Sequence, residues 1–161
     1  MDRKTPYNVP VSDSVQLPVL QKPSAAAAIF NRVFGFLVGL GIGPRYMQLL
    51  QVRGRKTGRV YSSPVNLLQL RGKSYLVAPR GRTQWVRNTE ATGEIVLKRG
   101  SVQRKYRLRP VADADKPEIL KVYLDSYKSA VQRFFPVRAG SPAESFRQIA
   151  SSYPVFELLP A

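Results

Sequence analysis

The chain has neither cysteine nor histidine among its 161 residues. Without cysteine there is no disulfide framework, no thiolate metal site and no cysteine nucleophile. Without histidine there is no Ser-His-Asp arrangement, no His-rich zinc site and no side chain of the usual general-base type near neutral pH. We therefore expect no metal site, and any chemistry must use a bound cofactor, other polar side chains or backbone donors.

Acidic residues are also scarce, because 10 Asp and Glu stand against 26 Lys and Arg, a net charge of +16. So large an excess in one small chain attracts an anionic partner, which is nucleic acid, an acidic membrane surface or a polyanionic small molecule. Charge alone does not choose among these three classes.

The first 23 residues lack the continuous apolar run of a secretory signal and contain four prolines. We interpret residues 1–23 as an extended N-terminal arm of a cytoplasmic protein. The whole chain has 43% hydrophobic residues, which is enough for the remaining segment 24–161 to form one domain with its own core.

Residues 24–42 are strongly apolar and predict a helix that begins at Ser24 and ends before Pro44. Asn31 and Arg32 near its middle argue against a membrane-spanning helix. The helical spacing predicts a core-facing stripe and a second face that mixes charge with apolar side chains; the first is Phe30, Val33, Phe34 and Leu37, and the second is Arg32, Phe36 and Leu40. Two interpretations stay open, a peripheral membrane contact through helix 24–42 or a helix wholly docked on the domain.

Strands and further helices follow. Strands are predicted at residues 46–52, 60–70, 74–79, 94–99, 101–111 and 153–160, and helices at 84–92, from 115 to about 135, and from 141 onward. Asp115 with Glu118, and Ser141 with Glu144, match the capping-box pattern at the starts of the last two helices. This order predicts an α+β fold around a mostly antiparallel sheet or barrel.

The most informative segment is 51–65, QVRGRKTGRVYSSPV. It gathers Arg53, Arg55, Lys56 and Arg59 around a turn bounded by glycines, which can direct amide groups and cations at one anion. Neither the P-loop pattern nor GxGxxG is present. From the residues alone, a phosphate site and a solvated hairpin tip both remain open.

Beyond this turn, residues 72–78 read GKSYLVA and residues 84–88 read QWVRN. These motifs, in this order and over about residues 49–111, resemble the deazaflavin-dependent nitroreductase (deazaflavin-dependent oxidoreductase) family. The closing segment YPVFEL is similar to the last strand of that family. The resemblance implies a split β-barrel of the FMN-binding type, with N-terminal and C-terminal helices packed around it.

The resemblance also implies the cofactor F-420, a deazaflavin with a phosphodiester and an oligoglutamate tail. Its reduced form would pass a hydride to an electron-poor quinone, enone or nitro compound. The implied cofactor-binding residues are Arg53, Arg55, Lys56, Thr57 and Arg59 for the phosphate and tail, Val60, Tyr61 and Ser62 for backbone contacts, Ala78, Pro79 and Arg80 along the cofactor, and Trp85 and Asn88 at its side.

Where family members have a serine and paired glycines, this chain has the segment 79–82, PRGR. Arg80 and Arg82 would then supply charge in place of backbone donors. Tyr123 and Tyr127 correspond to tyrosines that family members place over the substrate, and they are the candidates for catalytic residues. Their spacing fits the core stripe of a helix better, and Trp85 is open to the same interpretation as a core anchor.

Other functions stay open beside an F-420-dependent oxidoreductase. A split barrel can hold FMN or haem, and the chain could carry F-420 without catalysis. A basic nucleic-acid-binding domain is a further alternative, but no RNP-type, KH or helix-turn-helix pattern is visible, so no nucleic-acid partner is expected. A homodimer is left open, because barrels of this class often form dimers.

Overall fold

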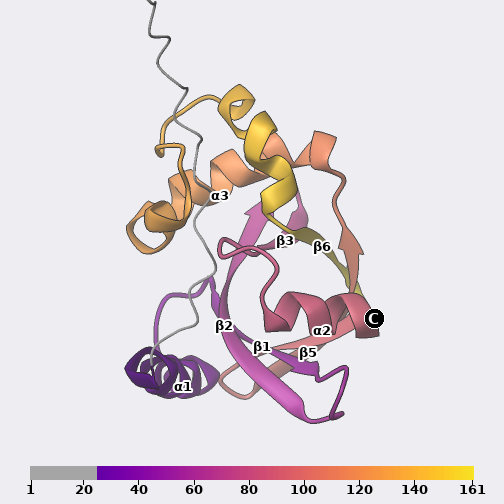
Figure 1. Cartoon of the computed structure of the whole chain (residues 1–161). Helices are drawn as coiled ribbons and strands as arrows, with labels where there is room; N and C mark the ends of the chain where they lie inside the picture. Colours follow the sequence, from indigo (N-terminus) through magenta and orange to yellow (C-terminus); the bar gives the residue numbers. More distant parts are fainter. Residues whose placement is uncertain (1–24) are drawn as a thin grey trace, which may run out of the picture.

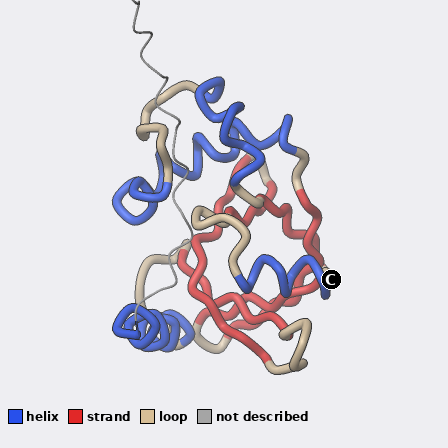
Figure 2. Tube along the Cα trace, viewed as in Figure 1, coloured by secondary structure: helices blue, strands red, loops and turns tan. Residues whose placement is uncertain are grey.

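The computed structural model describes residues 25–161. The predicted arm 1–23 and the predicted cap at Ser24 lie outside the described residues. Six strands form a closed barrel in the order β1-β2-β3-β6-β5-β4, with every neighbouring pair antiparallel (Figures 1 and 2). Their bounds are β1 Met47–Arg53, β2 Val60–Leu70, β3 Lys73–Val77, β4 Glu94–Arg99, β5 Val102–Pro110 and β6 Val155–Pro160. The barrel confirms the predicted fold class.

Apolar side chains that alternate along the strands fill the barrel interior. Because successive side chains of a strand point to opposite faces, Leu76 of β3 lies inside while its neighbours Tyr75 and Val77 lie outside. The buried residues of the interior cluster are Leu50, Val52, Val65, Leu76, Ile95, Leu97 and Leu158. This core fixes the register of β1 and β2, and so the place of the turn between them.

Helical segments cover the outside of the barrel. They are α1 Ala25–Gly39, α2 Gln84–Thr92, η1 Asp113–Asp115, α3 Lys116–Val131, η2 Gln132–Phe134 and η3 Ala143–Ser152, where η denotes a 3-10 helix. In Figure 1, α3 and η3 lie together above the β3 and β6 end of the barrel, whereas α1 lies apart from them, beside β1 and β2. A second core, which includes Leu120, Leu124 and Phe146, joins α3 and η3 to the outer face of β3.

The predicted capping boxes are wrong. Asp115 makes no side-chain cap hydrogen bond, since its backbone is already helical at φ −97° and ψ −5° rather than extended as in a normal N-cap. Glu118 instead pairs with Arg71. The last helix is of the 3-10 type and starts after Pro142, and its Glu144 pairs with Arg147 at 2.7 Å rather than reaching back to a cap.

The predicted core stripe of α1 is wrong at Val33, which is 55% exposed. The buried face is centred on Gly35, Val38 and Gly39. A Cβ added at either glycine would lie 3.4 Å or 3.1 Å from Leu49 side-chain atoms, so these two glycines let the helix approach β1 closely. The helix therefore packs on β1 through these two glycines, and this contact is compatible with both of the interpretations left open for helix 24–42. No helix in the described part of the chain is long and apolar enough to cross a bilayer.

One arginine holds the loop that follows α1. The Arg99 guanidinium at the end of β4 donates four hydrogen bonds, to the carbonyl oxygens of Gly41 (3.2 Å), Gly43 (2.7 Å), Pro44 (2.8 Å) and Met47 (3.0 Å). The four carbonyls belong to the loop after α1 and to the first residue of β1, so one guanidinium fixes the path of the chain between these two elements. Arg99 thereby ties α1 to the barrel.

On the outside of the barrel, Glu157 of β6 lies between two cations. Its carboxylate accepts a hydrogen bond from Arg109 at 2.6 Å and lies 3.4 Å from the Lys73 ammonium. The hydrogen bond and charge of Arg109 hold the pKa of Glu157 below its ordinary value. This lowered pKa means that the ionised form stabilises the fold.

We expect Glu157→Gln to lower the thermal midpoint at pH 7 by about 2 °C, since both cations are more than half exposed and partly screened. The stabilisation is complete above the unfolded-state pKa of about 4.3 and disappears as pH falls through the lower folded-state pKa. Thermal unfolding of both proteins between pH 7 and pH 3 measures this. A gap that widened with acidification would contradict the assignment.

Candidate functional site

The basic turn, residues 53–59, connects β1 to β2. The Gly54 amide donates to the Arg59 carbonyl at 2.7 Å, and the Gly58 amide donates back to the Gly54 carbonyl at 2.9 Å. A Cβ at Gly54 would lie only 2.5 Å from Cε2 of Tyr61. A side chain at this position would push the Tyr61 ring away from the backbone on which it packs. The two backbone hydrogen bonds and the Tyr61 contact therefore fix the conformation of the turn.

The four cations of the basic turn have no acidic partner. Arg53, Arg55, Lys56 and Arg59 are exposed, and none forms an ion pair within residues 25–161. The sequence explains this, since no Asp or Glu occurs between Asp13 and Glu90. Four uncompensated cations on one turn repel one another, and an anion bound among them would relieve that repulsion.

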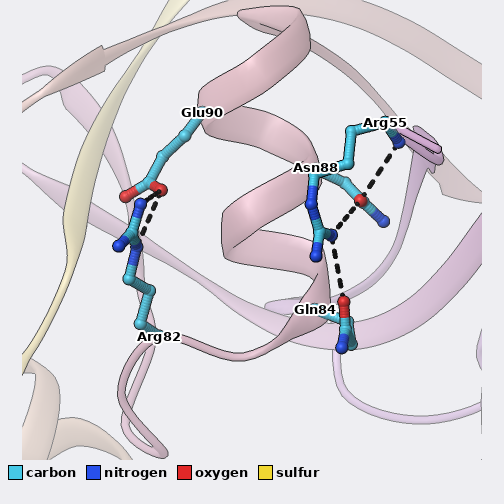
Figure 3. Close-up of polar contacts among 5 residues, drawn as sticks. All are labelled: Arg55, Arg82, Gln84, Asn88 and Glu90. Carbon is cyan, nitrogen blue, oxygen red and sulfur yellow. Dashed lines mark hydrogen bonds and ion pairs between the residues drawn. The ribbon is translucent and has the colours of Figure 1, made fainter.

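Arg55 connects the basic turn to α2. Its backbone amide donates to Asn88 Oδ1 at 3.2 Å, and its Nη1 donates to the same oxygen at 2.8 Å and to Gln84 Oε1 at 3.0 Å (Figure 3). Asn88 is buried on α2, with 4% of its surface exposed. Residues 33 positions apart are thus joined at one place.

The start of α2 is open to an anion as well. Thr83 precedes the helix but makes no side-chain cap hydrogen bond, and its Oγ1 is buried without a partner. The first amide groups of a helix carry partial positive charge and favour a negatively charged ligand. The adjacent Gln84 binds Arg55. These donors fit the phosphate of an anionic cofactor: a buried hydroxyl lacking a partner, an uncapped helix start and a fixed guanidinium.

The other residues predicted to bind the cofactor lie in the turn, at the start of β2, and after β3. Thr57 lies within the turn, where its hydroxyl accepts from the Arg59 amide at 3.3 Å and lies 3.3 Å from the Tyr61 hydroxyl. Val60 and Ser62 are exposed at the start of β2. Ala78 is buried and its amide donates to the carbonyl of Pro154, the residue before β6, which fixes its position.

The segment 79–82 does not join the basic turn. Pro79 is half-buried, and the exposed Arg80 lies with its guanidinium carbon 5.9 Å from the centre of the Phe134 ring. Arg82 donates to the Glu90 carboxylate at 2.9 Å and 2.6 Å (Figure 3). In Figure 3 this pair flanks α2 on the side opposite to Arg55. The charge that Arg82 was expected to supply to the cofactor is therefore compensated by Glu90.

Trp85 is half-buried and contacts the core beneath α2. Its ring centre lies 6.1 Å from that of Phe156, and it packs against Val86 and Ala78 in the small cluster at this end of the barrel. The core-anchor interpretation of Trp85 agrees with these contacts. The exposed remainder of the ring lies on the same helix as Gln84 and Asn88.

Tyr123 and Tyr127 lie in the core between α3 and the barrel, with 2% and 8% of their surfaces exposed. The Tyr127 hydroxyl donates to the Leu67 carbonyl at 2.7 Å. Burial raises the pKa of Tyr123, and a raised pKa makes a hydroxyl a weaker proton donor at neutral pH. These contacts support a structural role for both tyrosines.

We expect Tyr127→Phe to keep turnover within about twofold, and to lower the free energy of unfolding by about 1 kcal/mol through the lost hydrogen bond. Steady-state kinetics and urea unfolding measure the two effects separately. A loss of turnover of more than tenfold, with stability unchanged, would instead assign Tyr127 to the catalytic step.

A comparison with family models matches residues 27–141 to the family described as F420H(2)-dependent quinone reductase. The chain belongs to this family. It is therefore an oxidoreductase, and its cofactor is F-420. A comparison with curated proteins found no match.

Solved structures share the fold of this reductase at low sequence identity. A protein from Agrobacterium tumefaciens str. C58 has 15% identity and a TM-score of 0.54, covering 89% of this chain and 58% of that one. A domain-swapped dimer has 16% identity and a TM-score of 0.51, covering 84% and 100%. An F420-H2 dependent reductase has 18% identity and a TM-score of 0.48, covering 71% and 95%. The first two show the fold alone.

Sequence reasoning missed the contact of Gln84 with Arg55. Gln84 and Asn88 are four positions apart on α2, and residues at this spacing lie on the same face of a helix. With helix 84–92 predicted correctly, that spacing could have paired Gln84 with Asn88. The partner Arg55 could not have been found, since the contact depends on how the turn folds against α2.

Proposed function

We propose that this reductase binds reduced F-420 at the basic turn and α2, and transfers a hydride to a quinone. The observation that supports this most is the unpaired charge of the turn, four cations with no acidic partner in the described chain. A phosphodiester with a glutamate tail is the kind of anion that such a surface attracts.

The residues of the turn would act by binding and orientation. Arg55, Lys56 and Arg59 would hold the phosphate and tail, with Arg53 at the edge of the turn and Thr57 fixing its shape. The half-buried Trp85 would bound the ring side of the cofactor and exclude water from it. When bound, reduced F-420 supplies a hydride, which with a proton from solvent converts a quinone to a hydroquinone.

Anaerobic oxidation of reduced F-420 tests the reaction. The absorbance of oxidised F-420 should rise when enzyme and a short-chain quinone are both present, with one quinone consumed per F-420. An enone and a nitro compound run in parallel test the other acceptor classes. Oxidation with these two and none with the quinone would reject the quinone as acceptor while leaving the cofactor assignment intact.

We also infer that α1 meets an anionic membrane surface, where a lipophilic quinone is found. Four apolar side chains of α1 and the loop after it are more than half exposed: Val33 55%, Phe36 65%, Leu40 57% and Ile42 56%. Exposed arginines flank them at positions 32 and 45. An apolar face with basic flanks suits the boundary of an anionic bilayer. The cytoplasmic location stays a prediction.

Sedimentation with vesicles tests this contact. We expect binding to phosphatidylglycerol vesicles and little to phosphatidylcholine vesicles, and we expect Phe36→Ser with Leu40→Ser to weaken it about tenfold through lost apolar burial. Equal binding of the double variant would contradict a role for this face. Dimerisation of the wild-type chain that the variant abolishes would assign the face to a second copy, as the homodimer prediction allows.

The second candidate is FMN in the same place, since a basic turn can hold any phosphate. Haem is the other cofactor that the sequence left open. Absorbance titrations with each cofactor separate these from F-420. Family membership favours F-420.

A further inference from the structure

Two arginines flank α2, and they are held by different kinds of partner (Figure 3). Arg82 donates twice to the carboxylate of Glu90, so its charge is compensated by an ion pair. Arg55 donates only to the amide oxygens of Gln84 and Asn88. A neutral amide fixes the direction of a guanidinium as a carboxylate does, but it leaves the positive charge available.

The hydrogen bonds of Asn88 also fix its own orientation. Its Oδ1 accepts from two donors of Arg55, the backbone amide at 3.2 Å and Nη1 at 2.8 Å. An amide whose oxygen faces Arg55 must direct its NH2 group elsewhere. Within the described chain that NH2 group donates to no partner, although Asn88 is only 4% exposed. The NH2 nitrogen is not among the buried unpartnered atoms of the described chain, so an oriented donor that reaches solvent lies beside an oriented cation.

We propose that Gln84 and Asn88 are positioning residues that present Arg55 as an oriented, uncompensated guanidinium to the phosphate of F-420. Asn88 adds its own NH2 group to the same anion. The inference rests on the proposed function, because it takes F-420 as the ligand. An arginine side chain free in solvent loses rotamer entropy when it binds, and a guanidinium already held in place avoids most of that loss.

Because the partners of Arg55 are neutral, only ligands that carry a negative charge bind more tightly at this guanidinium. A phosphate oxygen can accept from the remaining guanidinium donors and from the Asn88 NH2 group. A deazaflavin chromophore with its ribityl chain but no phosphate has no charge to place there. The latch formed by Gln84, Asn88 and Arg55 therefore raises the affinity for F-420 over that for the phosphate-free chromophore. It has little effect on contacts with the ring.

Asn88→Asp tests this most sharply, because it keeps the shape and one acceptor for Arg55 but adds a negative charge. We expect it to weaken F-420 binding about 30-fold or more, and Asn88→Ala to weaken it about fivefold. Gln84→Glu should act in the same direction as Asn88→Asp. Gln148→Glu on η3 is the matched control, an exposed glutamine given the same charge, and should change binding less than about twofold.

Fluorescence titrations with F-420 and with the phosphate-free chromophore measure both ligands on each variant. The chromophore should change less than about twofold in every case, since it lacks the charged group. Unchanged F-420 binding by Asn88→Asp would overturn the inference. Equal losses for both ligands would overturn it too, because they would show that Asn88 only supports the fold.

Hydrogen exchange of the Arg55 backbone amide gives a readout that needs no cofactor. Asn88→Ala should speed this exchange about tenfold or more, whereas Asn88→Asp should not. Unchanged exchange in Asn88→Ala would overturn the latch itself. If the wild-type protein failed to bind F-420, the proposed function would be rejected, and the exchange data would still decide whether Asn88 holds Arg55.

Discussion

Replacing Arg55 and Lys56 together by alanine is expected to weaken F-420 binding about 100-fold. Each side chain can give a charge-assisted hydrogen bond to the phosphate or the tail, worth roughly 1.5–3 kcal/mol. Removal of two such contacts costs about 3 kcal/mol of binding free energy, which corresponds to an increase of about 100-fold in the dissociation constant. Weaker dependence of binding on salt should accompany the loss, because fewer charges take part.

The matched control for this double variant is Arg104→Ala with Arg107→Ala on β5. Both arginines are exposed and neither forms an ion pair within residues 25–161, so the net charge falls by the same amount at another place. F-420 binding should change less than about threefold in this control. Equal losses in the two double variants would show that only the overall charge attracts the cofactor, and the turn would lose its assigned role.

Arg99→Met is expected to be the most destabilising change of a charged residue in this fold, lowering the free energy of unfolding by about 3 kcal/mol. Methionine keeps much of the apolar stem but removes all four hydrogen bonds to the carbonyls of the loop after α1. The part-buried carbonyls of Gly41 and Met47 would then lose this partner unless water replaces the guanidinium. The loop and α1 should loosen first.

Urea unfolding measures the loss, and hydrogen exchange locates it in residues 36–47. The control is Arg104→Met on the adjacent β5, where the side chain is exposed and makes no hydrogen bond in the described chain, and it should change stability by less than about 0.5 kcal/mol. A small effect of Arg99→Met, equal to this control, would mean that the four hydrogen bonds of Arg99 contribute nothing to the attachment of α1.

The sequence predicted the barrel well because its strands carry local signals. Segments 60–70, 84–92 and 94–99 were predicted with the bounds that β2, α2 and β4 have. Gly93 ends α2 in the left-handed conformation at φ 71°, which glycine adopts without strain. Such signals depend on neighbouring residues only, so they can be read without the tertiary structure.

The predictions failed where distant residues decide the outcome. Val33 fits a core stripe by spacing, yet it faces out, because α1 packs on β1 through Gly35 and Gly39. Glu118 fits a capping box, yet it pairs with Arg71, which is 47 residues away. For the same reason, the partners of Arg55 and Arg82 became visible only when the chain was folded.

The most direct test of the account is a fluorescence titration of the wild-type protein with F-420, with FMN in parallel. We predict saturable binding of F-420 at micromolar concentration or below, competition by high salt, and weaker binding of FMN, which lacks the glutamate tail. No binding of F-420, or tighter binding of FMN, would contradict the assignment of the basic turn as the F-420 site.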